Sequence, residues 1–200
     1  MSEDERRAWD DRYGSGEYQP RPVAGPFLEA WIDRLPVGRA LDIACGAGRH
    51  ALRLAAAGFQ VDAVDVSRVA IELAREEAGR RGLEVNWVVG DLDHYELPAA
   101  TYDVITVIRY VNPRLWPRLV DALAPGGWIL IEHHLRTTAD VDGPRSPEFR
   151  LEPQELLEAF DSLRIVFYEE TLEPADRSDR CHALARLVAT SGDPDWEFKS

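Results

Sequence analysis

The sequence has little cysteine, no long apolar run and no excess of positive charge. Its two cysteines, Cys45 and Cys181, lack the spacing of a disulfide framework or a metal site. No run of roughly 18 apolar residues is present, so we expect no membrane span. A formal net charge of −13 argues against binding to nucleic acid, because that requires clustered cations to displace counterions from phosphates.

What is present is typical of a single globular domain. An apolar fraction of 45% is enough to bury one core, and the polar, acidic N-terminus is unlike a signal peptide. We therefore expect a cytoplasmic protein that is a monomer or a homodimer. Residues 1–190 are predicted to form the domain, with 1–35 as an N-terminal helical flap and 191–200 as a tail.

Apolar segments and helical patterns alternate along the chain, which predicts a parallel sheet with helices on both faces. The expected strands are 40–44, 59–64, 85–89, 102–108 and 128–132, followed by 164–168 and 182–188. The expected helices follow the first strand and Ser67, then cover 115–123 and 153–160. The last two strands have no room for a helix between them, so they must pair antiparallel.

A glycine turn follows the first predicted strand, with the sequence Ala44-Cys45-Gly46-Ala47-Gly48. Its glycines allow a ligand to approach the backbone closely, and the helix that follows directs unpaired N–H groups to the same place. Asp65 ends the second strand, where a carboxylate can accept hydrogen bonds from both hydroxyls of a ribose. This edge of an open sheet is where ligands bind.

The turn alone leaves several functions open. The run Gly46-Ala47-Gly48-Arg49-His50-Ala51 also satisfies the dinucleotide fingerprint, in which Asp65 would bind the ribose of NAD. An NAD-dependent oxidoreductase is therefore one alternative. A cofactor-binding protein without catalytic turnover is another.

Three further features distinguish these alternatives. Asp42 is a charged residue inside an apolar strand, Gly90-Asp91 ends the third strand, and the chain closes with the antiparallel pair. Together they resemble the class I S-adenosylmethionine-dependent methyltransferases over residues 9–190. The resemblance implies a seven-stranded, mostly parallel Rossmann-like sheet with an antiparallel last strand. It also implies S-adenosyl-L-methionine as cofactor.

By this resemblance, residues at the ends of strands one to four bind the cofactor. Asp42 and the glycine turn would surround its methionine part, Asp65 the ribose, Val66 the adenine ring and Asp91 the adenine amino group. The residues implied are Asp42, Ala44, Cys45, Gly46, Gly48, Asp65, Val66, Asp91, Leu92 and Ile108. Ala44 departs from the family pattern, which has glycine at that position.

Finer motifs resemble the tellurite-resistance-like branch of small methyltransferases. These are Trp9-Asp10-Asp11-Arg12-Tyr13, the run 42–49, and Ser146-Pro147-Glu148-Phe149-Arg150. The resemblance implies transfer of a methyl group to a small soluble acceptor, such as a metalloid oxyanion or a thiol. The Asp/Asn-Pro-Pro-Tyr run of enzymes that methylate base amino groups is absent after the fourth strand.

The acceptor is expected above the ends of strands four and five. Arginine offers a planar fork for an oxyanion, and aromatic rings of the flap would exclude water. The acceptor-pocket candidates are Tyr13, Arg109, Tyr110, His133 and Arg136. No catalytic base stands out, and we expect no metal because the side chains of His133 and His134 point to opposite faces of a strand.

Overall fold

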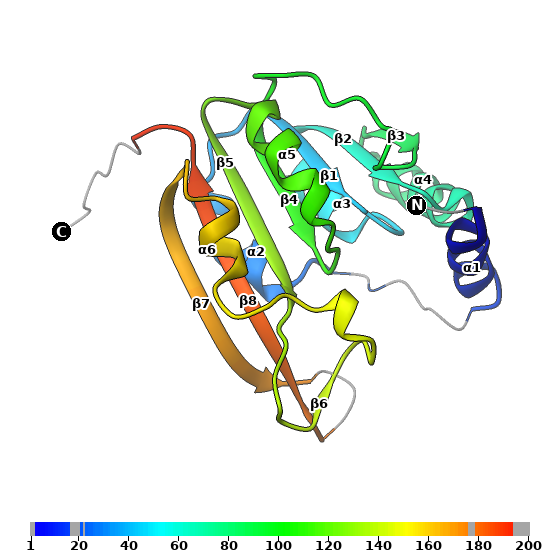
Figure 1. Ribbon diagram of the computed structural model, residues 1–200. Coiled ribbons are helices and arrows are strands. Elements are labelled where there is room, and N and C mark those ends of the chain that lie inside the picture. Colours follow the sequence, from blue (N-terminus) through cyan, green and yellow to red (C-terminus); the bar gives the residue numbers. More distant parts are fainter. Residues whose placement is uncertain (1–2, 17–20, 22, 176–178, 194–200) are drawn as a thin grey trace.

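The computed structural model describes residues 3–16, 21, 23–175 and 179–193. Its strands form one twisted sheet with helices on both faces (Figure 1). The strands are β1 (Arg39–Ile43), β2 (Gln60–Asp65), β3 (Asn86–Val89), β4 (Tyr102–Ile108), β5 (Leu123–His134), β6 (Val141–Asp142), β7 (Arg164–Pro174) and β8 (Cys181–Thr190). The α-helices are α1 (Glu3–Gly14), α2 (Pro26–Trp31), α3 (Arg49–Ala56), α4 (Arg68–Arg81), α5 (Trp116–Ala122) and α6 (Glu155–Ala159). Three 3-10 turns, η1 (Ile32–Arg34), η2 (Pro113–Leu115) and η3 (Pro147–Phe149), complete the elements.

The sheet has the predicted topology. Strands β3, β2, β1, β4 and β5 lie side by side in that order and run parallel. β8 pairs antiparallel with β5 on one edge and with β7 on the other, which confirms the antiparallel closing pair. The two-residue β6 is an addition at the start of β8. Seven long strands with one antiparallel member match the predicted fold class.

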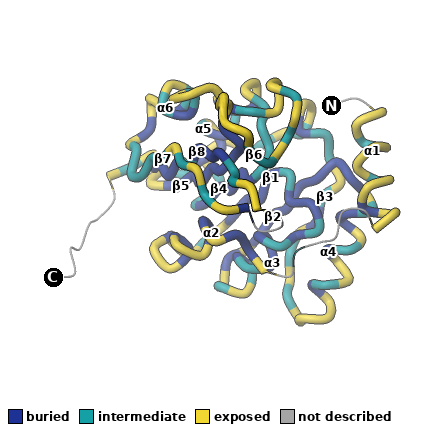
Figure 2. The backbone as a smooth tube through the Cα atoms, turned by 90° about the horizontal axis from the view of Figure 1, so that it is seen from below, coloured by how far each residue is buried: buried dark blue, intermediate teal, exposed yellow. Residues whose placement is uncertain are grey.

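Each face of the sheet packs on its own layer of helices. Leu28 of α2, Leu54 of α3 and Ile71 of α4 are completely buried on one face. Leu119 of α5 and Phe160, the C-cap of α6, are completely buried on the other. Full burial of such a side chain stabilises the fold by roughly 1.5–3 kcal/mol. The strands between them form the buried centre of the molecule (Figure 2).

The helix predicted over 115–123 is present but one residue shorter at each end, and the strand after it begins earlier than predicted. The structure has a 3-10 turn, η2, and then α5, which has Pro117 in its first turn because proline lacks the N–H that a helix interior requires. β5 begins at Leu123, five residues earlier than predicted, and pairs there with Tyr102. The register between the two strands shifts after Tyr102, and Gly126 adopts a φ of 81° in the irregular segment.

The second correction concerns β7, which was expected to end at residue 168. It continues to Pro174 because Arg186 of β8 forms ion pairs with Glu169 and Glu173 across the two strands. Residues 176–178 of the following connection lie outside the described residues.

The N-terminal segment divides into two parts. α2 packs into the core through Phe27, Leu28 and Trp31, whereas α1 buries only Tyr13 and lies beside α4 (Figure 1). At the other end, Ser191 donates a hydrogen bond to the carbonyl of Ala124. The rest of the predicted tail, 194–200, lies outside the described residues. No helix in the described part of the chain has the length and apolarity needed to cross a membrane.

Substitution of Gly48 tests the packing below the glycine turn. Gly48 has a φ of 81°, and a Cβ there would overlap the indole ring of Trp87. We predict that Gly48→Ala lowers the free energy of unfolding by about 2–4 kcal/mol, from left-handed strain and overpacking. The matched control is Gly79→Ala in the exposed part of α4, where a Cβ would meet no atom within 4 Å.

In the control Gly79→Ala, the free energy of unfolding should rise by about 0.5–1 kcal/mol, because alanine has the higher helix propensity and lowers the entropy of the unfolded chain. Urea unfolding of the two variants measures both effects. Equal effects of the two substitutions would contradict the packing account.

Candidate active site

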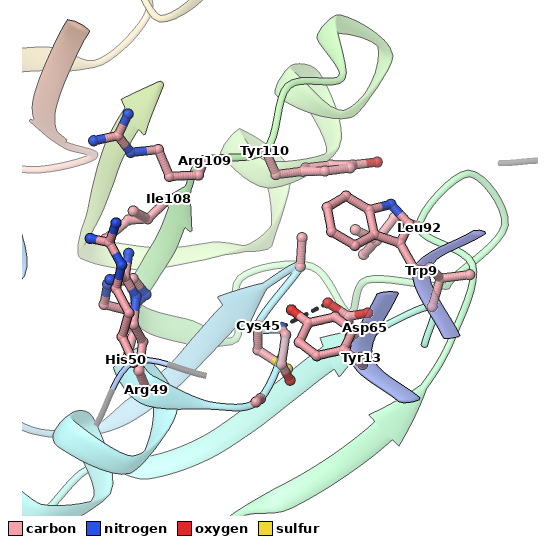
Figure 3. A pocket seen from close by; sticks show the side chains of 15 residues that line it. Trp9, Tyr13, Cys45, Arg49, His50, Asp65, Leu92, Ile108, Arg109 and Tyr110 are labelled. Carbon is pink, nitrogen blue, oxygen red and sulfur yellow. Dashed lines mark hydrogen bonds between the residues drawn. The ribbon is translucent and has the colours of Figure 1, made fainter. Parts of the chain in front are cut away.

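A pocket opens where β1, β2 and β4 end, between the glycine turn and α1. Figure 3 draws the side chains that line it and labels ten of them. The residues that line it are Trp9, Tyr13, Arg21, Ala44, Cys45, Gly46, Ala47, Arg49, His50, Asp65, Val66, Leu92, Ile108, Arg109 and Tyr110. They come from six separate parts of the chain, and the strand order β2-β1-β4 brings the ends of three strands together.

The glycine turn is fixed by a buried carboxylate from the neighbouring strand. Oδ2 of Asp65 accepts the N–H of Gly46 at 2.7 Å, and Oδ1 accepts the N–H of Ser67 at 2.8 Å. Burial raises the pKa of the Asp65 carboxyl, and these backbone hydrogen bonds oppose the rise. Because an ionised carboxylate offers about four lone-pair sites, Asp65 keeps acceptor capacity toward the pocket.

Ala44 and Gly46 both lie in the left-handed region, with φ of 53° and 54°. Alanine there costs about 1–2 kcal/mol relative to a glycine, which explains why the family pattern has glycine at the position of Ala44. At Gly46 a side chain is excluded sterically, because a Cβ would overlap the hydroxyl of Tyr13. The turn therefore presents bare backbone to the pocket.

Asp42 does not line the pocket. It is almost completely buried, and its carboxylate accepts the hydroxyl of Thr106 at 2.8 Å and the N–H of Ala51 at 3.0 Å. These bonds join β1 to β4 and to the first turn of α3. Asp42 thus holds the helix that follows the glycine turn, and burial raises its pKa to about 7.

Two other predicted cofactor residues also lie outside the pocket lining. Gly48 is the N-cap of α3 and lies against Trp87 and Ala74. Asp91 accepts the N–H of Asp93 at 3.0 Å and is 3.0 Å from Nδ1 of His94. The other seven predicted cofactor residues, Ala44, Cys45, Gly46, Asp65, Val66, Leu92 and Ile108, do line the pocket.

One side of the pocket is basic. Arg109 directly follows β4 and has a φ of 66°, a conformation that costs of order 1–3 kcal/mol in a non-glycine residue. Its Nε lies 3.2 Å from Oε1 of the buried Glu132, and its Nη1 lies 3.0 Å from Nε2 of His134. Because a guanidinium only donates, His134 accepts and is neutral. Burial and then Arg109 lower the pKa of His134 well below its usual value.

The sequence analysis did not predict Arg21 and Arg49 as lining residues and treated His50 as packing, whereas Ala47 belongs to the predicted turn. His50 is buried, and its Nε2 accepts the N–H of Gly25 at 3.2 Å, which ties the segment before α2 to α3. Burial lowers the pKa of His50 to about 3, with Arg49, Arg109 and Arg21 adding to the shift. Its place in the first turn after the glycines was the available signal.

The acceptor candidates divide in the same way. Tyr13, Arg109 and Tyr110 line the pocket, whereas His133 and Arg136 do not. His133 bonds through Nε2 to the carbonyl of Phe149 at 2.9 Å, and Arg136 forms an ion pair with Glu152. In the described ranges, no three His, Cys, Asp or Glu residues group as metal ligands.

Comparison with known proteins agrees with this geometry. A family model described as a methyltransferase domain matches residues 40–127, which contain the glycine turn, Asp65 and β4. The chain carries a class I methyltransferase domain. S-adenosylmethionine is the cofactor that this domain class implies, and the match favours it over NAD.

The relatives of this methyltransferase domain are named for different methyl acceptors. The chain is 34% identical over 119 residues to ribosomal protein L11 methyltransferase of Symbiobacterium thermophilum, covering 59% of this chain and 38% of that protein. It is 29% identical over 138 residues to a ubiquinone biosynthesis O-methyltransferase of Thiobacillus denitrificans, covering 64% of this chain and 58% of that protein. The chain thus spans about two to three fifths of the length of these relatives.

The fold match extends further than the sequence match. The crystal structure of TehB from Haemophilus influenzae superposes with a TM-score of 0.73 at 22% identity, over 91% of this chain and 66% of that one. At this identity the likeness shows the fold of the methyltransferase domain and its closing strands.

The residues present fit S-adenosylmethionine. The bare backbone at Gly46 and the buried carboxylate of Asp65 would hold the sugar and its neighbours. The apolar side chains of Val66, Leu92 and Ile108 offer a surface for a flat ring. A cavity that combines apolar walls with a few fixed polar groups is typical of cofactor sites.

The raised pKa of Asp42 predicts a specific dependence of stability on pH. Asp42 binds its proton more tightly in the folded protein than in the unfolded chain, where its pKa has the ordinary value of 3.8. The free energy of unfolding attributable to Asp42 therefore falls as pH rises from about 4 to about 7, and is constant above. Asp42→Asn removes this titration, so the variant should gain stability relative to the parent protein between pH 5 and 8. Urea unfolding at four pH values measures the difference, and parallel curves would contradict it.

Proposed function

We propose that this protein is an S-adenosylmethionine-dependent methyltransferase that acts on a small soluble acceptor. The observation that carries the proposal is the glycine turn of a methyltransferase domain, locked by Asp65 and open to a pocket. A purely structural turn would not require a carboxylate lining a cavity. A cofactor-binding protein without turnover is the remaining alternative.

Each side of the pocket has a separate task in this proposal. Asp65 would accept the ribose hydroxyls, and Val66 and Leu92 would contact the adenine. The backbone of the turn and Arg49 would face the amino-acid end of the cofactor, whose carboxylate suits an arginine. Arg109 and Tyr110, at the end of β4, would then face the acceptor.

The bound cofactor would supply an electrophilic methyl group on a sulfonium sulfur. Transfer of that group to a soft nucleophile depends on alignment, and orientation can contribute on the order of 7–11 kcal/mol. The protein's part is therefore to hold the acceptor in line and to exclude water through Trp9 and Tyr13. A catalytic base is required only if the acceptor carries a proton at neutral pH.

The basic side of the pocket supports an anionic acceptor. In a chain with a net charge of −13, three lining residues are arginines, Arg21, Arg49 and Arg109. Against these three arginines, Asp65 is the one carboxylate among the described lining residues, and Glu132, which pairs with both Arg109 and Arg186, lies outside the lining. A metalloid oxyanion or a thiolate fits that charge. The acidic surface supports the expectation that nucleic acid is not a partner.

A methyl-transfer assay with mass-spectrometric detection of S-adenosylhomocysteine tests the function directly. The panel should contain thiols, metalloid oxyanions and small amines, each with the pure protein. Product formation with at least one acceptor is expected. Cofactor binding without product over the whole panel would favour the non-catalytic alternative.

Replacement of Arg109 tests the acceptor class. We predict that Arg109→Met raises KM for an anionic acceptor at least tenfold, because a hydrogen bond to a charged group contributes about 1.5–3 kcal/mol. The affinity for S-adenosylhomocysteine should stay within a factor of three. Arg136→Met is the matched control, since Arg136 lies outside the pocket and pairs with Glu152. A loss of cofactor affinity with unchanged KM for the acceptor would assign Arg109 to the cofactor instead.

A further inference from the structure

The link between α1 and the start of α4 is a feature that the cofactor site does not explain. Oδ1 of Asp10 accepts the hydroxyl of Ser67 at 2.7 Å and the N–H of Val69 at 3.2 Å. Ser67 is completely buried and is itself the N-cap of α4, because its Oγ accepts the N–H of Ala70 at 3.1 Å. A carboxylate from a distant segment thus completes the cap.

This position suits a negative charge. The first turn of a helix has N–H groups without partners and the positive end of the helix dipole. Ser67 satisfies one N–H and Asp10 another, so the two side chains share the task. The neighbour of Ser67 in sequence is Val66, which lines the pocket, and Asp65 precedes it. The docking point of α1 is therefore adjacent to the residues proposed to bind the cofactor.

The apolar contact of α1 with the rest of the protein is small. Among its residues only Tyr13 is buried, and its main contacts are with α4. Burial of one tyrosine gives a helix a weak apolar anchor. The bonds of Asp10 to Ser67 and Val69 therefore contribute to the position of α1, the dark blue helix beside α4 in Figure 1.

The residues on either side of Asp10 form one wall of the pocket. Trp9 precedes it, and Tyr13 follows one turn later, with ring centroids 6.1 Å apart. The hydroxyl of Tyr13 lies so close to Gly46 that it would overlap a Cβ at that residue. Both rings face the pocket opposite Arg49 and His50 (Figure 3). The bonds of Asp10 therefore tie α4 to the segment of α1 that carries both rings.

We propose that Asp10 is a positioning residue that docks α1 as the lid of the cofactor pocket. This inference rests on the proposed function, because the lid retains the cofactor assigned there. While Asp10 caps α4, Trp9 and Tyr13 cover the bound cofactor and slow its release. When the bonds to Ser67 and Val69 break, α1 moves away from the pocket and the cofactor dissociates.

Calorimetry and stopped-flow dissociation with S-adenosylhomocysteine test the proposal. Asp10→Ala should bind about tenfold more weakly, with most of the change in the dissociation rate, since a lid acts after binding. Asp10→Asn keeps a side-chain acceptor without the charge, so its affinity should be intermediate. Asp11→Ala is the matched control, because Asp11 is the next residue of α1 and its side chain is exposed.

A second readout separates a lid from a general loss of stability. Trypsin cleaves after the arginines of α1, and S-adenosylhomocysteine should protect these sites in the parent protein and in Asp11→Ala. Protection should be lost in Asp10→Ala while the unfolding temperature without ligand stays close to that of Asp11→Ala.

These measurements distinguish a failure of the lid proposal from a failure of the proposed function. Equal affinity and protection in Asp10→Ala and the parent protein would overturn the lid proposal alone. Weaker binding matched by a large fall in unfolding temperature would overturn it as well, in favour of a purely structural role. No binding by the parent protein would overturn both the lid and the proposed function.

Discussion

The hydrogen bond from Gly46 to the carboxylate of Asp65 is the interaction on which the site depends. It joins the turn after β1 to the end of β2, and it holds backbone in a left-handed conformation beside a cavity. Asp42 supports the same turn from below through Thr106 and Ala51. Asp65 thus holds the turn directly, and Asp42 holds the first turn of the helix that follows it.

The pocket above the turn is divided by charge. Apolar groups and Asp65 lie toward α1, and arginines lie toward the ends of β4 and α3 (Figure 3). The strained backbone of Arg109 is consistent with this division, because Glu132 and His134 hold its guanidinium beside the pocket. Strain of this kind persists only where the surroundings determine it, and it is concentrated at functional sites.

The order of strands and the turn with Asp65 could be predicted from the sequence, because they depend on local apolar runs and on glycine spacing. The direction in which a side chain points could not be predicted in this way. Asp42 and Gly48 follow the family pattern, yet the first turns toward Thr106 and the second packs on Trp87. No sequence pattern distinguishes Arg49 as a pocket residue. Its place in the pocket depends on the position of α3, which those contacts fix.

The extension of β7 and the early start of β5 were missed for a similar reason. The first depends on ion pairs between Arg186 and glutamates that are distant in sequence, and the second on the pairing of Leu123 with Tyr102. The docking of Asp10 on α4 is also a contact between distant segments. It became visible only in the assembled structure.

Calorimetric titration with S-adenosylhomocysteine tests the central claim, that the locked turn is a methyltransferase cofactor site. The parent protein should bind one molecule per chain, and NADH should neither bind nor compete. Asp65→Asn should weaken binding at least tenfold, because it removes the charge that a pair of ribose hydroxyls would contact. Binding of NADH in place of S-adenosylhomocysteine, or unchanged affinity in Asp65→Asn, would contradict the account.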